Sequence, residues 1–168
     1  DKHKALVAHV DAMSSAPGAD LIEAEVAELR GRANALIEQG TALDKLYTAI
    51  GYKADEGALG RLLSTEEHLE RTVRPLISTG ETAPLRLWAA TLGMFRQEAR
   101  ARLVLEESLL GAFEVDQGRF TRALAQLSGD AEAEKASVQQ AGEAYQAAFQ
   151  SWAELEQQVA GQGEKLKG

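Results

Sequence analysis

An unbroken heptad pattern runs through the first third of the chain and constrains its fold more than any other feature. Apolar or small residues recur there in steps that alternate between four and three, namely Ile22, Val26, Leu29, Ala33, Leu36, Gly40, Leu43, Tyr47 and Ile50. This spacing keeps one face of an α-helix apolar over its whole length. The sequence therefore predicts a long helix over 22–50 that packs against other helices.

Two shorter helices are predicted next. Glycines at both ends of Gly51–Gly57 end the first helix, and we expect the chain to reverse there. Residues 59–76 then carry a leucine-rich stripe that Glu66 interrupts. Thr82 is a suitable N-cap for a third helix, with its apolar stripe at Leu85, Trp88, Leu92, Phe95, Ala99 and Leu103. We expect this helix to end near Gly111.

The longest predicted helix covers 116–163. Its apolar positions keep the four-three alternation through Ser128–Gly129, which favours one continuous helix. Near its end, Tyr145, Phe149 and Trp152 gather, and core packing is favoured for them over a ligand pocket or a dimer contact. The first fifteen residues also look helical, with Leu6, Val10 and Met13 on one face, but the phase breaks at Pro17–Gly18.

The predicted fold is all-α, with residues 1–168 forming a single domain. Its helices form an antiparallel up-down-up-down four-helix bundle, in which two long outer helices flank a shorter central hairpin. The first long helix is broken near Pro17–Gly18. The termini of such a bundle lie at one end, as they would if each continued into a transmembrane helix, so we expect this chain to be part of a longer membrane protein.

Composition excludes several classes of function. The net charge of −8 disfavours nucleic acid as a partner. The chain has no cysteine, which excludes thiolate chemistry, and His68 has no partner at metal-ligand spacing. Motifs for nucleophilic catalysis or nucleotide binding do not occur. We therefore expect no enzyme activity, no metal and no cofactor.

Two short stretches combine glycines, acidic residues and arginine in a recognisable order. They comprise Gly51-Tyr52, Asp55-Glu56-Gly57, Gly60, Leu62 and Glu70, followed by Met94-Phe95-Arg96-Gln97-Glu98 and Leu103. In this the chain resembles the extracytoplasmic helical-bundle sensor domains of bacterial methyl-accepting chemotaxis receptors, including the helical bimodular domains. The resemblance covers about residues 47–127. It implies a dimeric periplasmic domain of an inner-membrane protein that binds a small solute and transmits a signal across the membrane.

Arginine is the residue type that most suggests an anion site. Between Ala54 and Glu134 the chain has nine arginines and no lysine, and the planar guanidinium group pairs well with carboxylates. Arg96 and Arg100 are four residues apart beside the predicted apolar stripe, so they are the first candidates for an anion clamp. The alternative, which the residue pattern favours, is that they form surface ion pairs with Glu98, Glu106 or Glu107.

Three further residues complete the candidate ligand site. Tyr52, Arg61 and His68 lie near the glycine-rich turn or on the second helix, where His68 offers a contact that depends on pH. The alternative is a solvent-exposed helix face, which is the more common arrangement. Gly31 and Gly40, inside the first helix, suggest either close helix packing or a flexible point.

The preferred function is that of a chemoreceptor sensor domain for a small anionic solute, with an organic acid or an amino acid favoured. Two alternatives remain open. One is the sensor domain of a membrane histidine kinase. The other is a helical interaction or structural bundle that binds no small ligand and recognises a protein partner.

Overall fold

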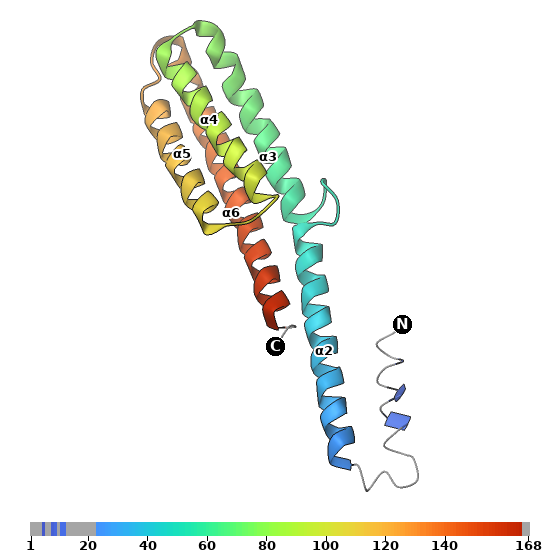
Figure 1. Cartoon of the computed structure of the whole chain (residues 1–168). Coiled ribbons are helices and arrows are strands. Elements are labelled where there is room, and N and C mark those ends of the chain that lie inside the picture. The colour runs from blue at the N-terminus through green and yellow to red at the C-terminus, as the bar shows by residue number, and fades with distance from the viewer. Residues whose placement is uncertain (1–4, 6–7, 10, 13–22, 166–168) are drawn as a thin grey trace. The chain divides into compact units, whose positions relative to one another are not determined.

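The computed structural model describes residues 5, 8–9, 11–12 and 23–165. Within these ranges the chain forms helices and loops and no β-strand, which confirms the all-α class. The elements in Figure 1 are α2 (Glu23–Ile50), α3 (Gly57–Val73), η2 (Arg74–Thr79), α4 (Thr82–Ala101), α5 (Glu107–Ala125), η3 (Gly129–Glu134) and α6 (Lys135–Lys165). The predicted break at Pro17–Gly18 and the stripe residues Leu6, Val10 and Met13 lie outside the described residues.

The chain divides into two compact units, one made of residues 1–47 and 158–168 and the other of residues 48–157. In the first unit, Val26 and Ala33 of α2 are buried. Leu29, Leu36 and Tyr47 occupy the same heptad face but are 43%, 49% and 44% exposed. The predicted apolar face of α2 is therefore only partly covered.

The second unit has one core, to which α3, α4, α5 and the first part of α6 contribute (Figure 1). On α3 the buried leucines are those that the sequence predicts, including Leu62 and Leu69. The aromatic residues of α6 are buried as well, and Phe149 stacks on Phe113 of α5 with ring centroids 4.1 Å apart. Core packing of Tyr145, Phe149 and Trp152 is thus confirmed.

None of the described helices combines the length and the apolar character that crossing a bilayer requires.

Glycines close a tight loop between α2 and α3. Gly51 and Gly57 have φ angles of +104° and +58°. A Cβ atom on Gly57 would lie 2.6 Å from the carbonyl oxygen of Ala49. Because only glycine combines that φ with that close approach, these residues are required for the loop to return onto the end of α2.

The third and last predicted helices have the wrong boundaries. The third ends at Ala101 instead of near Gly111, and residues 102–106 connect it to a separate helix, α5. The predicted continuous helix over 116–163 is also wrong, because α5 ends at Ala125 and η3 precedes α6. Ser128 is extended, with φ −146° and ψ 176°. Serine and glycine are weak helix formers, so Ser128–Gly129 breaks the helix although the apolar spacing continues.

The buried face of α4 also differs from the predicted one. Leu85, Leu92 and Leu103 were expected in the core but are 48%, 46% and 85% exposed. The buried row is Leu87, Thr91, Met94, Glu98 and Ala101. It lies one residue N-terminal to most of the predicted stripe, which amounts to about 100° of helix rotation. Because two members of this row are polar, hydrophobic periodicity selects the neighbouring row instead.

Replacing Gly31 or Gly40 with alanine is expected to stabilise the protein by about 1 kcal/mol each. Both lie inside α2, and an added Cβ would meet no described atom within 4 Å. Alanine therefore gains helix propensity without a steric cost. Urea unfolding of the two variants measures the change. A loss of stability would instead reveal a helix or a second chain packed closely against these glycines.

Candidate functional site

The five residues predicted to bind ligand lie on three elements. Tyr52 is in the loop after α2, Arg61 and His68 are on α3, and Arg96 and Arg100 are on α4. All five are exposed. Arg96 and Arg100 lie away from the core because the buried face of α4 is the neighbouring one. None of the five lines the hollow described below, and their role in binding stays a prediction.

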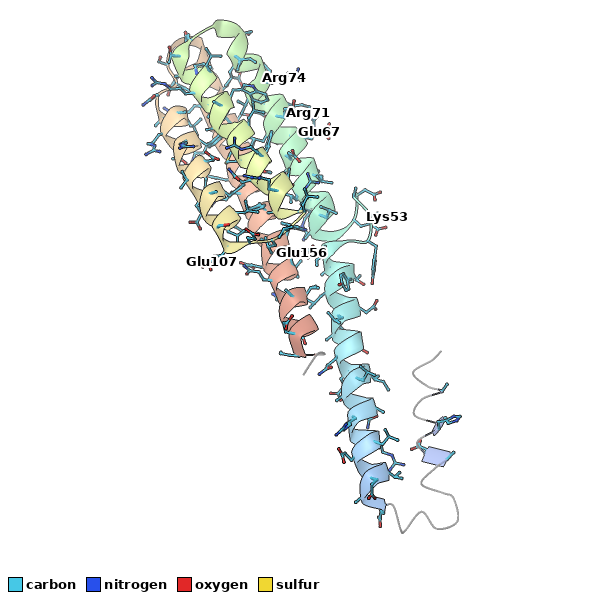
Figure 2. All side chains as sticks on the ribbon, viewed as in Figure 1. Lys53, Glu67, Arg71, Arg74, Glu107 and Glu156 are labelled. Carbon is cyan, nitrogen blue, oxygen red and sulfur yellow. The ribbon has the colours of Figure 1, made fainter. Side chains whose placement is uncertain are left out.

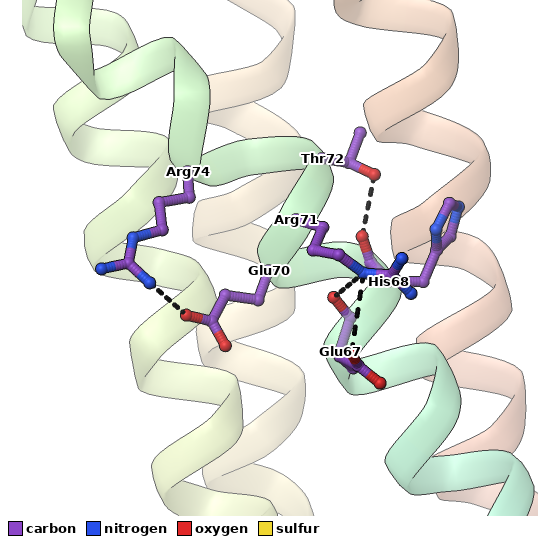
Figure 3. A network of polar contacts seen from close by, with 6 residues as sticks. All are labelled: Glu67, His68, Glu70, Arg71, Thr72 and Arg74. Carbon is purple, nitrogen blue, oxygen red and sulfur yellow. Dashed lines mark hydrogen bonds and ion pairs between the residues drawn. The ribbon is translucent and has the colours of Figure 1, made fainter.

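The outer side of α3 carries ion pairs between residues four positions apart, one of which reaches the first residue of η2. Arg71 pairs with Glu67 and Arg74 with Glu70, at 3.8 and 3.2 Å, and these side chains are largely exposed (Figures 2 and 3). The contact of His68 drawn in Figure 3 uses its backbone carbonyl oxygen, which accepts a hydrogen bond from Thr72 at 2.8 Å. Exposed pairs of this kind contribute little to stability, so this face resembles an ordinary solvated surface.

A hollow between α4 and α5 gathers three other arginines. Arg86 comes from α4, and Arg119 and Arg122 come from α5. The hollow has a volume of about 370 Å³, and alanines of both helices line it. We call it the arginine hollow. These arginines belong to the lysine-free segment noted in the sequence, so arginine enrichment was the available indication of this site.

One carboxylate, that of Asp116, accompanies the three guanidinium groups. The side chain of Asp116 is buried and pairs with Arg119 at 2.7 Å. Gln97 donates a hydrogen bond to its second oxygen at 3.4 Å. The carboxylate lies against Gly93 of α4, where a Cβ would approach its Cγ to 2.7 Å. Gly93 thus makes room for an acidic group beside Arg119.

The charge and size of the arginine hollow suit a small anion. Three arginines and one aspartate give it a formal charge of +2, within a chain whose net charge is −8. The Arg86 guanidinium group already donates a hydrogen bond to the side chain of Gln126 at 3.4 Å. This bond holds the guanidinium group beside the end of α5. Guanidinium groups from two helices can bind the two oxygens of one carboxylate. A volume near 370 Å³ falls in the range of small-molecule sites.

A second polar feature lies inside the core of the same unit. Glu98 of α4 is fully buried. Tyr145 of α6 donates a hydrogen bond to Glu98 Oε2 at 3.4 Å, and Arg102 Nε lies 2.6 Å from Oε1. Oε1 nevertheless has no aligned hydrogen-bond donor among the described residues. Burial, followed by the charge of Glu66, raises the pKa of Glu98 to about 7.

Glu66 of α3 completes this carboxyl cluster, which we define as Glu66, Glu98, Arg102 and Tyr145. The carboxyl groups of Glu66 and Glu98 lie near enough to each other that each alters the pKa of the other. Burial is the main cause that raises the pKa of Glu66, and Arg102 opposes it. Sequence reasoning noted that Glu66 interrupts the stripe of its helix but assigned it no partner. It placed Glu98 on the surface, which is wrong.

Metal ligands do not gather in the described part of the chain, where no group of three or more His, Cys, Asp or Glu side chains could hold an ion.

Comparisons of the chain with family models, with curated proteins and with solved structures find no match. The resemblance to chemoreceptor sensor domains therefore stays a prediction.

Proposed function

We propose that this chain is the periplasmic ligand-binding sensor domain of an inner-membrane chemoreceptor, and that it recognises a small organic acid or amino acid. The observation that carries the proposal is the arginine hollow, a space of about 370 Å³ that three arginines from two helices line. Asp116 neutralises only one of the three positive charges, so the hollow keeps a positive charge that attracts an anion. The solute would supply that anion.

Signalling then follows from the position of the hollow. A carboxylate held by Arg86 and Arg122 would join α4 to α5, and so favour the packing of these helices that best fits the ligand. A ligand shifts such an equilibrium only by its difference in affinity for the two states. Contacts from two helices supply this difference, whereas Arg96 and Arg100 both lie on α4.

The proposed architecture is an up-down-up-down four-helix bundle built from α3, α4, α5 and α6, within a single sensor domain over 1–168. It would form a homodimer in a membrane-anchored parent protein. The exposed heptad residues Leu29, Leu36 and Tyr47 of α2 support the dimer, because a second copy can cover them. The same residues also favour the second candidate function, a helical bundle that recognises a protein partner and binds no small ligand.

A thermal-melt screen against small carboxylates, amino acids and inorganic anions tests the proposal. A ligand at about 100 times its dissociation constant adds about 2.7 kcal/mol, which raises the melting temperature by roughly 5–10 °C. Arg86→Ala and Arg122→Ala should abolish the shift. We choose these two because Arg119 also pairs with buried Asp116, so its loss would itself destabilise the fold.

Two control variants locate the site. Arg71→Ala removes an exposed arginine of α3 and should leave the shift intact. The double variant Arg96→Ala/Arg100→Ala should also leave it intact. If the shift disappears only in that double variant, the ligand site is the one predicted from sequence and not the arginine hollow. A flat screen would favour the partner-binding bundle or a histidine kinase domain without a ligand of its own.

A further inference from the structure

The carboxyl cluster lies where three helices meet. Glu66 belongs to α3, Glu98 to α4 and Tyr145 to α6. We propose that Glu66 and Glu98 form a shared proton-binding site whose occupancy couples the pH of the surroundings to the packing of α3 against α4. This inference does not depend on the arginine hollow, which lies between α4 and α5.

The surroundings of Glu98 favour a proton at this site, because Glu98 is fully buried and its Oε1 has no hydrogen-bond donor among the described residues. Two ionised carboxylates are both acceptors and cannot bond to each other. Glu66 and Glu98 can therefore share a hydrogen bond only when one of them is protonated. With that proton, the remaining carboxylate and the Arg102 guanidinium form a neutral set. Without it, the cluster carries one uncompensated negative charge beside the fully buried Glu98, which is costly.

The groups around Glu98 determine which of its two carboxyl oxygens already accepts a hydrogen bond. Tyr145 donates to Glu98 Oε2, and burial raises the pKa of the Tyr145 hydroxyl, so it stays a donor. Arg102 Nε approaches Glu98 Oε1 without hydrogen-bond alignment. From α3, Glu70 adds a further negative charge near Glu66. From α5, the Phe113 ring packs against Tyr145 at 5.9 Å and contributes no charge.

The direction of the pH effect follows from linkage. The pKa of Glu98 is about 7 in the folded protein, above its ordinary value of 4.5. Between these two pH values the folded state binds a proton that the unfolded state has released, so stability falls as the pH rises through this window. Within this window the stability is highest at the acid end, and above about pH 7 it no longer changes with pH. Release of the proton restores the repulsion between α3 and α4.

The first experiment follows the side-chain carboxyl ¹³C shifts of Glu66 and Glu98 by NMR from pH 4 to pH 9, in the absence of added ligand. We expect Glu98 to titrate with a midpoint near 7 and Glu66 to titrate above its ordinary range. In Glu66→Gln the midpoint of Glu98 should fall, because the repelling charge is gone and Arg102 remains. Two ordinary titrations below pH 5 would overturn the proposal.

Unfolding at two pH values provides the second readout. A group with a midpoint near 7 should lower the folding equilibrium constant roughly tenfold between pH 6 and pH 8, which corresponds to a fall in melting temperature of roughly 3–5 °C. Glu98→Gln keeps the shape of the protonated carboxyl and should remove most of this difference. Glu67→Gln, an exposed neighbour on α3, should preserve it. If Glu98→Gln retains the full difference, other groups cause it and the proposal fails.

Discussion

Tyr145→Ala is expected to destabilise the protein by about 3–5 kcal/mol, the range found when a large buried aromatic side chain is removed. Tyr145 is fully buried. Its ring meets Phe95 edge-on at 5.3 Å and Phe113 at 5.9 Å, so the truncation leaves a cavity between α4, α5 and α6. Denaturant unfolding measures the loss.

Tyr145→Phe is the matched control because it keeps the ring and removes only the hydroxyl group. It should cost about 1 kcal/mol, the usual net value of one hydrogen bond. It should also raise the pKa of Glu98 further, since the Tyr145 hydroxyl favours the charged carboxylate. A cost below about 1 kcal/mol for Tyr145→Ala would contradict the packing described around this ring.

Gly57→Ala is expected to cost about 2–5 kcal/mol, from the combination of backbone strain and steric overlap. The φ angle of +58° disfavours any side chain, and the added Cβ would meet only backbone atoms, which cannot rotate away. The loop after α2 would have to open. Chemical denaturation, with circular dichroism to follow helix content, measures the effect.

Gly80→Ala separates the two contributions to this cost. Gly80 also has a positive φ, of +69°, but an added Cβ would meet no described atom within 4 Å. It should therefore show the conformational cost alone, about 1 kcal/mol. Equal losses in the two variants would show that the close approach of Ala49 to Gly57 does not constrain the loop.

Helix content and the core face of α3 could be predicted from the sequence, because Leu62, Leu69 and Val73 mark that face although Glu66 interrupts it. The helix ends at Ala101 and Ala125 could not. Leu127 and Ala131 are both buried, so apolar spacing continues through a segment that is not α-helical. Apolar periodicity indicates which side of a segment faces the core. A 3-10 helix or a loop can keep the same apolar spacing, so the spacing alone does not locate a helix end.

The candidate site was harder to predict for a related reason. A polar residue in the core is stabilised by its partners, and apart from nearby Arg102 the groups that interact with Glu98 lie on α3 and α6. Sequence periodicity contains no information on such partners, so it assigns Glu98 to the surface. With the face of α4 misplaced, the choice among nine arginines fell on Arg96 and Arg100. Arg86 lines the same hollow as Arg119 and Arg122 only because α4 and α5 pack together.

The close pairing of α4 with α5 has a consequence for the order of folding. These helices pack extensively on each other, and only residues 102–106 separate them. Contacts between neighbouring elements close short loops and so tend to form early. The α4–α5 pair should therefore assemble before α6 docks, and it already holds every arginine of the arginine hollow. If the proposed anion binds the arginine hollow, it would then act first on the newly made chain, as a template that draws these two helices together.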